Sequence, residues 1–216
     1  MTNGTFVTFE GTEGSGKTTQ IKLLKEHLEE CQVPTITTKE PGGTSHGMQI
    51  RSLILDPYTT FQSRYTELML FYADRFEHIE SVIKPALDQN KVVICDRYID
   101  STIAYQIGGR KMPKKLIQTL NNYIDLMPTV TFYLDILPET GLDRAQKRAA
   151  LDRFEQEDIE FHNRVRTTYL NQANSHPNRI IPINANNQSI TAIHKKIVRH
   201  LRKYVPIKQP KKEKAS

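Results

Sequence analysis

The segment FVTFEGTEGSGKTTQIKLL, residues 6–24, sets the fold class because it joins a strand, a glycine-rich loop and a helix in an order that binds phosphate. Residues 6–9 are apolar or β-branched and predict a buried strand. The glycines of GTEGSGKT, residues 11–18, allow backbone N–H groups to curl around phosphate oxygens. Apolar residues follow at helical spacing, so a helix over residues 17–30 is expected to direct its N-terminus at the anion.

The residue types of this loop indicate a site for a nucleoside triphosphate. Lys17 would reach the terminal phosphates, and Thr18 would bring its hydroxyl to Mg²⁺. The alternative is a glycine-rich turn with a coincidental Lys-Thr pair, and the flanking strand and helix argue against it. We therefore predict that the triphosphate is held by Gly11, Thr12, Glu13, Gly14, Ser15, Gly16, Lys17, Thr18 and Thr19.

Length and composition indicate one soluble domain over residues 1–205. The 216 residues are 38% hydrophobic, which is ample for the core of one large α/β domain. Cys31 and Cys95 lack metal-ligand spacing, and this favours reduced thiols in the cytoplasm. The N-terminus has no basic region followed by an apolar stretch, and no run of about 18 apolar residues occurs, so we expect no membrane partner.

The net charge of +6 is concentrated at the C-terminus. The last nine residues, KQPKKEKAS, hold four Lys and one Glu, so the remainder carries only +3. We expect residues 206–216 to be a basic, disordered tail. An arm that contacts nucleic acid or a membrane is the alternative, but four lysines would give only weak, salt-sensitive binding. No nucleic-acid partner is predicted.

Strand and helix patterns alternate along the chain, which predicts a parallel sheet with helices on both faces. The expected strands cover residues 6–9, 35–38, 91–95, 129–134 and 179–183. The expected helices cover residues 17–30, 47–55, 65–87 with a bend near Pro85, 113–126, 138–149, 157–174 and 189–204. Pro182 predicts that the last strand lies at an edge.

In such sheets the ligands bind at the carboxyl ends of the strands. Asp96 comes at the end of the third expected strand, and an apolar strand that ends in a carboxylate is typical of an element that binds Mg²⁺ directly or through water. The alternative is that Asp96 caps the following helix. Arg97 follows Asp96 and would place a permanent cation next to the metal ion, which is unfavourable unless anions lie between the two. A second phosphate group meets that need.

Cations and aromatic residues suggest two further parts of a phosphoryl-transfer site. Residues 144–157 carry Arg144, Arg148 and Arg153 and read either as a mobile lid or as a solvated helix face. Phe71 and Arg75 could stack on and hydrogen-bond to a base, although helical aromatics often belong to a core. Ser101, Tyr105 and Gln106 recur on one helical side, where a Gln amide suits a pyrimidine edge and an ordinary polar surface is the alternative.

Together these residues resemble the thymidylate kinase family over nearly the entire chain. The matching segments are FEGTEGSGKTT at 9–19, EPGGT at 40–44, Arg51, LFYADR at 70–75, DRY at 96–98, DSTIAYQ at 100–106 and LDRFEQE at 151–157. The resemblance implies a three-layer P-loop nucleoside monophosphate kinase fold and a homodimer. It also implies transfer of the γ-phosphate of ATP to dTMP with Mg²⁺, giving dTDP.

The resemblance assigns roles to the candidate residues. Lys17 and the loop amides would hold ATP, Thr18 and Asp96 would serve Mg²⁺, and Arg144 is a candidate for the adenine. The resemblance further implies that the acceptor is bound by Glu13 at its 3′-hydroxyl, by Lys39, Arg51 and Arg97 at or near its phosphate, by Phe71, Arg75, Ser101 and Gln106 around the base, and by Tyr105 against a 2′-hydroxyl.

Two departures from the family pattern concern the cations. One branch of the family carries an arginine where this chain has Gly14, so the missing charge is expected from the lid, from Arg148 first and Arg153 next. Lys39 replaces the arginine usual before EPGG, which exchanges a bidentate fork for a point charge.

Two rival functions keep the phosphate loop. A nucleotide-driven switch or motor would couple its cycle to a partner, but the Asn-Lys-x-Asp and Asp-x-x-Gly motifs of a GTPase do not occur. A kinase of the same fold could also use another nucleoside monophosphate or a nucleoside as acceptor.

Overall fold

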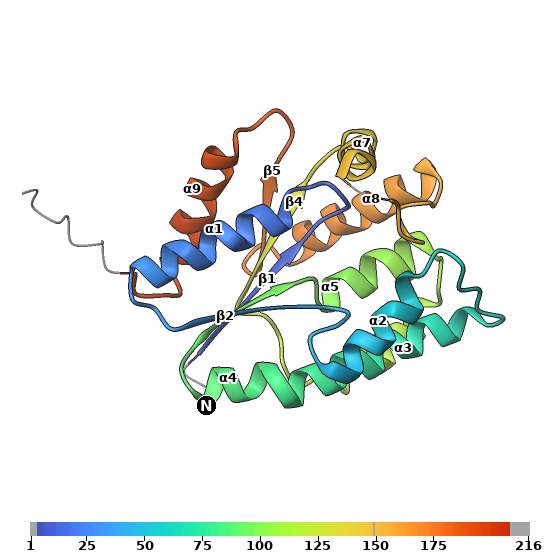
Figure 1. Ribbon diagram of the computed structural model, residues 1–216, viewed down its shortest axis with the longest axis horizontal. Helices are drawn as coiled ribbons and strands as arrows, with labels where there is room; N and C mark the ends of the chain where they lie inside the picture. Colours follow the sequence, from blue (N-terminus) through green and yellow to red (C-terminus); the bar gives the residue numbers. More distant parts are fainter. Residues whose placement is uncertain (1–3, 149, 208–216) are drawn as a thin grey trace, which may run out of the picture.

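Five parallel strands form one sheet in the order β2-β3-β1-β4-β5 (Figure 1). They are β1 (Thr5–Glu10), β2 (Thr35–Lys39), β3 (Val92–Asp96), β4 (Val130–Asp135) and β5 (Ile180–Asn184). This computed structural model describes residues 4–148 and 150–207 except the side chain of residue 148, so the predicted tail falls almost entirely outside it. The predicted α/β fold with a five-stranded parallel sheet is confirmed, and β5 lies at an edge as Pro182 predicts.

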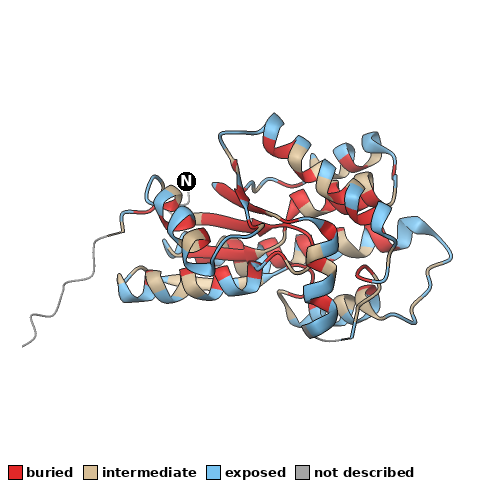
Figure 2. Ribbon diagram, turned by 90° about the horizontal axis from the view of Figure 1, so that it is seen from above, coloured by how far each residue is buried: buried red, intermediate tan, exposed pale blue. Residues whose placement is uncertain are grey.

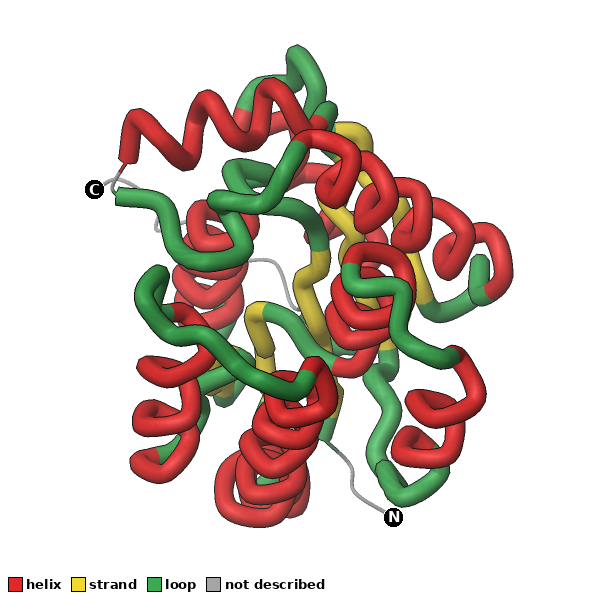
Figure 3. The backbone as a smooth tube through the Cα atoms, turned by 90° about the vertical axis from the view of Figure 1, so that its right-hand side faces the viewer, coloured by secondary structure: helices red, strands yellow, loops and turns green. Residues whose placement is uncertain are grey.

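Helices cover both faces of this sheet, as Figure 3 shows. They are α1 (Lys17–Glu30), α2 (Ser45–Leu55), α3 (Arg64–His78), α4 (Lys84–Asp88), α5 (Ile99–Thr102), α6 (Lys114–Asn121), α7 (Pro138–Arg148), α8 (Ile159–Ser175) and α9 (Ile190–Leu201), with the π-helical segments η1 (Ile79–Ile83) and η2 (Ile103–Gly109). None of the helices in the described part combines the length and apolarity that crossing a bilayer requires.

Alternation along the strands divides the core into layers. Val7 and Phe9 of β1 pack with Leu24 of α1 and Ile197 of α9. Phe6 points to the other face, where it packs with the apolar residues of α3, η1 and α4. A third cluster joins α8 and η2 to β4 and β5. The three central strands β1, β3 and β4 are therefore almost wholly buried, whereas the edge strands β2 and β5 are partly exposed. The outer faces of the helices are exposed (Figure 2).

The structure corrects three of the expected helices. The helix expected over residues 65–87 contains the π-helical turn η1 immediately before α4, since Pro85 has no N–H to donate to a helical ladder. The helix expected over residues 113–126 ends at Asn121, whose Oδ1 accepts a hydrogen bond from Tyr72 Oη at 2.6 Å. The helix expected over residues 189–204 ends at Leu201, ahead of Pro206.

The segment after β3 is helical over α5 and η2, an element that the sequence patterns did not delimit. Its backbone begins beside the phosphate loop, because Phe9 of β1 pairs with Asp96 of β3. Lys39 of β2 pairs with the same Asp96 from the other side. The carboxyl ends of β1, β2 and β3 thus meet at one edge of the sheet, where chain connections can build a site.

Candidate active site

The phosphate loop between β1 and α1 is built on glycines with positive φ. Gly11, Gly14 and Gly16 have φ of 148°, 65° and 94°, conformations that a residue with a Cβ rarely adopts. Lys17 folds back over the loop, and its Nζ donates to the carbonyl oxygens of Gly11 at 3.0 Å and Thr12 at 3.1 Å. Burial lowers the pKa of Lys17 to about 8. An incoming phosphate would favour the charged form of this lysine.

The loop continues into the exposed N-terminus of α1. Thr18 and Thr19 are exposed there, and Ser15 is buried within the loop. The N–H groups of the first turn of a helix have no helical partners, so this end of α1 can bind an anion.

Arg97 links the end of β3 to the phosphate loop. Its Nη2 lies 2.9 Å from Glu13 Oε1, and its Nη1 donates to the carbonyl oxygen of Gly11 at 3.0 Å. Tyr105 Oη donates to the same Glu13 oxygen at 2.7 Å. Burial alone would raise the pKa of Glu13, but Arg97 and Lys17 hold it below its usual value. Arg97 itself has φ of 69°, and such backbone strain concentrates at functional sites.

Asp96 has an unpaired oxygen beside this loop. Its Oδ1 is buried and has no hydrogen-bond partner among the described residues. The side chain does not cap the following helix, whose N-cap is Tyr98 without a side-chain hydrogen bond. Within residues 4–148 and 150–207, no group of three or more His, Cys, Asp or Glu side chains could hold a metal ion. Mg²⁺ commonly needs only one or two protein ligands beside phosphate oxygens, and Asp96 with Thr18 fits that requirement.

A cavity beside the phosphate loop brings all the predicted acceptor residues together. The predicted acceptor residues Glu13, Lys39, Arg51, Phe71, Arg75, Arg97, Ser101, Tyr105 and Gln106 all line it, as do Lys17, Thr18 and Asp96. These residues come from the phosphate loop, β2, α2, α3, the end of β3, α5 and η2. Cations, carboxylates and aromatic rings therefore share one cavity that opens onto the phosphate loop.

Arg75 is held in that cavity by three protein acceptors. The side chain is 2% exposed, and its Nε donates to Glu40 Oε2 at 2.8 Å. Its Nη1 donates to Thr102 Oγ1 at 2.9 Å, and its Nη2 donates to the carbonyl oxygen of Tyr98 at 3.0 Å. A guanidinium has five N–H groups, so Arg75 keeps donors for a ligand in a fixed orientation.

Two further cations of the cavity lining, Arg51 and Lys39, differ in how far they are held in place. Arg51 Nη1 donates to the carbonyl oxygen of Pro41 at 2.8 Å, which orients the guanidinium toward the cavity. Lys39 is exposed at the end of β2.

The hydroxyl of Ser101 is fixed by a buried carboxylate. Its Oγ donates to Glu10 Oε2 at 2.6 Å, so it is not free to turn.

The arginines of the predicted lid separate in space. Arg144 of α7 lies on the phosphate loop, with Nη1 3.4 Å from the carbonyl oxygen of Gly14. The side chain of Arg148 lies outside the described residues, and its role stays a prediction. Arg153 contacts α2 and α3, since its Nη1 lies 2.7 Å from Glu67 Oε2 and its Nε donates to the carbonyl oxygen of Ile54 at 2.9 Å.

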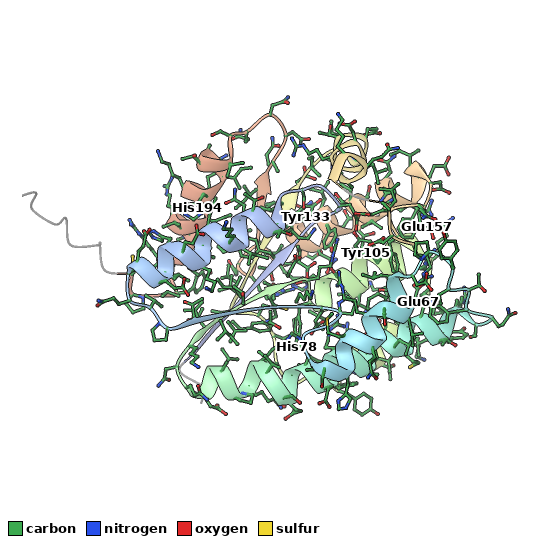
Figure 4. All side chains as sticks on the ribbon, viewed as in Figure 1. Glu67, His78, Tyr105, Tyr133, Glu157 and His194 are labelled. Carbon is green, nitrogen blue, oxygen red and sulfur yellow. The ribbon has the colours of Figure 1, made fainter. Side chains whose placement is uncertain are left out.

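Sequence reasoning missed three residues of the cavity and its wall. Glu40 orients Arg75, and Phe154 lines the cavity with its ring centroid 6.0 Å from that of Phe71. Glu67 lies behind this wall, in the same region as Tyr105 and Glu157 (Figure 4). The position of Glu67 four residues before Phe71 on one helix was the available signal, because residues at that spacing share a face.

Comparisons with known proteins agree with this geometry. The family model described as thymidylate kinase matches residues 9–197. A thymidylate kinase of Acinetobacter baumannii (strain AYE) is 46% identical over 182 residues, covering 83% of this chain and 92% of the relative. A thymidylate kinase of Acholeplasma laidlawii is 44% identical over 201 residues, covering 92% of this chain and 98% of the relative.

A solved structure extends the similarity to the fold. The crystal structure of thymidylate kinase from Ehrlichia chaffeensis superposes with a TM-score of 0.76 at 36% identity, and the match covers 92% of this chain and 98% of that one. The phosphate loop, the cation-lined cavity and these similarities have one explanation: the chain belongs to the thymidylate kinase family.

Proposed function

We propose that this protein transfers the γ-phosphoryl group of ATP to dTMP and releases dTDP and ADP. The observation that carries the proposal is the single cavity that the phosphate loop lines together with Arg51 and Arg97 and with Phe71, Arg75 and Gln106. The two arginines suit phosphates, and Phe71 offers an aromatic face beside fixed polar groups.

The proposed reaction is a direct in-line displacement. An oxygen of the acceptor phosphate forms a bond to the γ-phosphorus, while the bond from that phosphorus to the β,γ-bridging oxygen breaks and ADP leaves. The acceptor phosphate is largely ionised near neutral pH, so no side chain is needed as nucleophile or general base. Catalysis then consists of positioning and charge stabilisation by Lys17, Arg97 and the lid arginine Arg148.

Thr18 and Asp96 are the proposed Mg²⁺ ligands, Asp96 directly or through water. The unpaired Oδ1 of Asp96 supports this assignment, since a buried carboxylate oxygen otherwise lacks a compensating contact. The bound ion would neutralise charge on the β- and γ-phosphates.

In the proposed acceptor complex each part of dTMP meets a distinct group. Arg51 and Arg97 hold the 5′-phosphate, with Lys39 near it, and Glu13 accepts from the 3′-hydroxyl. Phe71 stacks on the base. Arg75 and Gln106 hydrogen-bond to its polar edge, and Ser101 lines the same wall. Tyr105 fills the space that a ribose 2′-hydroxyl would need, which favours deoxyribose.

We further propose a homodimer that works in the cytoplasm without nucleic-acid or membrane partners. Exposed apolar side chains occur on α2 and α3, a concentration that a soluble monomer seldom leaves in water. They are Met48, Leu53, Tyr65, Met69 and Phe76. Both Cys31 and Cys95 are free thiols, which suits a reducing compartment.

The first experiment measures ADP release from ATP and Mg²⁺ with each nucleoside monophosphate in turn, using Lys17→Ala as the blank. Strong stimulation by dTMP, and much weaker stimulation by dCMP and dGMP, is expected. A slow ADP release that no acceptor changes would contradict the proposal and favour a switch or motor. Strong stimulation by a different acceptor would keep the kinase chemistry and reassign the substrate.

A further inference from the structure

We propose that Glu67 determines base selectivity by fixing the orientation of the Gln106 side-chain amide. Glu67 lies on α3, is 5% exposed, and does not line the cavity. Gln106 Nε2 donates to Glu67 Oε1 at 3.3 Å, and Gln106 is itself 2% exposed with its side chain at the cavity wall. This inference rests on the proposed position of the acceptor base against Gln106.

The contact leaves only one orientation for the amide. An ionised carboxylate accepts hydrogen bonds and donates none, so the Gln106 group that faces Glu67 must be the NH₂. The carbonyl oxygen Oε1 is then the group available to a ligand, and none of the described residues donates a hydrogen bond to it. Gln106 therefore presents an acceptor to the base, although its side chain could in principle present either an acceptor or a donor.

An acceptor at this position distinguishes pyrimidines. Thymine and uracil carry an N–H at ring position 3, which can donate to Gln106 Oε1. Cytosine has an unprotonated nitrogen there, and two acceptors facing each other leave both unpaired, which costs far more than a missing methyl contact. Arg75 adds to the discrimination, because its remaining N–H groups match a carbonyl oxygen and not the amino group of cytosine.

Glu67 is itself anchored by two arginines from different parts of the chain. Arg153 Nη1 lies 2.7 Å from Oε2, and Arg110 Nε lies 3.3 Å from Oε1. Nη1 of the same Arg110 forms an ion pair with Glu157 Oε1. These contacts hold the Glu67 carboxylate in place beside Gln106.

The same anchor shapes the cavity wall. The Phe154 ring packs against both cations, with its centroid 4.9 Å from the Arg153 guanidinium carbon and 5.2 Å from that of Arg110. Phe154 in turn lies beside Phe71 and Tyr105, with centroid distances of 6.0 Å and 5.8 Å. In this arrangement Arg153 supports the acceptor wall, in contrast to the lid role that the sequence suggested for it.

Glu67→Gln tests the proposal, since a Gln at this position can donate as well as accept and so permits Gln106 to turn. The readout is the ratio of kcat/KM for dTMP to kcat/KM for dCMP, both measured on one preparation. This ratio is independent of the fraction of active enzyme, so partial unfolding of the variant does not affect it. We expect the ratio to fall by about tenfold or more, the size of one mismatched hydrogen bond.

Arg153→Met is the matched control, because it removes the same ion pair but leaves the carboxylate facing Gln106. We expect it to raise KM for dTMP and to leave the selectivity ratio within about twofold of wild type. A fall in the ratio for Arg153→Met as large as that for Glu67→Gln would overturn the proposal, as it would assign the effect to a loosened wall. A large loss of kcat with KM unchanged in Arg153→Met would contradict the wall role and indicate that Arg153 stabilises the transition state as a lid arginine.

Further variants separate the possible failures. In a Gln106→Leu background, Glu67→Gln should change the ratio no further, since the effect acts through Gln106. If Glu67→Gln is insoluble, Glu67→Asp withdraws the carboxylate by one methylene and should also lower the ratio. An unchanged ratio in these Glu67 variants refutes the proposal. If Phe71→Ala and Gln106→Leu both leave KM for dTMP unchanged, the proposed acceptor site is wrong instead.

Discussion

Replacement of Gly14 by Ala should disrupt the contact between the phosphate loop and α7. Gly14 has φ of 65°, and a Cβ built on it would lie 2.1 Å from the carbonyl oxygen of Gly141, the residue of α7 that meets the loop. Contacts of a Cβ below 3.0 Å essentially never occur, so the two backbones must separate by about 0.9 Å. Backbone atoms of a helix cannot move aside as a flexible side chain can.

Two costs add in this variant. The left-handed conformation costs about 1–2 kcal/mol for a residue with a Cβ, and overpacking against Gly141 costs about 1–3 kcal/mol. Gly16→Ala is the matched control, since Gly16 also has positive φ, 94°, but its Cβ would meet nothing within 4 Å. Only the backbone cost of about 1–2 kcal/mol is expected for the control. Gly14→Ala should therefore be less stable than Gly16→Ala by about 1–3 kcal/mol.

The assay is urea unfolding of the nucleotide-free proteins, followed by circular dichroism, with equal m values required for the comparison. Nucleotide is omitted because its binding to the folded state would add to the measured stability and obscure the comparison. If Gly14→Ala is no less stable than Gly16→Ala, the close approach of loop and helix does not exist in solution. The lid helix would then not be coupled to the phosphate loop through these glycines.

Two other predictions concern the lid and the core beneath the acceptor site. Arg148→Ala should lower kcat much more than it raises KM for dTMP, because the loop lacks a cation at Gly14. Steady-state kinetics measure both constants, and the reverse pattern would show that Arg148 does not stabilise the transition state. Burial raises the pKa of Asp74 to about 6 from 3.8, so its stabilising contribution is complete below pH 3.8 and is lost as pH rises through 6. The unfolding free energy of wild type relative to Asp74→Asn should therefore fall by up to about 3 kcal/mol across this window. Parallel pH profiles for wild type and Asp74→Asn would contradict the assignment.

The sequence predicted best where neighbouring residues act together. The helix over residues 17–30 begins and ends as its apolar spacing indicates. The strand and the loop that precede this helix were predicted equally well, because an apolar run, glycines and a following Lys-Thr pair lie within a few residues of one another. Helix ends were less accurate: α6 stops at Asn121, where a contact from Tyr72 on another element competes with the helix. Local propensity carries no information about such a partner.

The candidate site was predictable in its membership and only partly in its arrangement. Every predicted acceptor residue lines the cavity, since each follows a strand or faces the sheet edge where ligands bind. The partners of Arg153 were not predictable, because the charge pattern of residues 144–157 cannot reveal a carboxylate on α3. Proximity in sequence to Arg144 suggested a shared lid, and the folded chain gives the two side chains different partners, Gly14 for Arg144 and Ile54 for Arg153.

The sequence by itself thus determined the phosphate loop, the alternation of strands and helices, and the chemical types gathered for phosphate and base. Periodicity and glycine spacing are properties of short segments, so they can be read without the fold. Only the tertiary structure decided the strand order β2-β3-β1-β4-β5 and the partners of buried charges. The contact of Glu67 with Gln106 joins residues 39 positions apart and exists because α3 and η2 pack together. Hydrogen bonds of this kind depend on distances of a few ångströms, and those distances are set by the packing of the whole core.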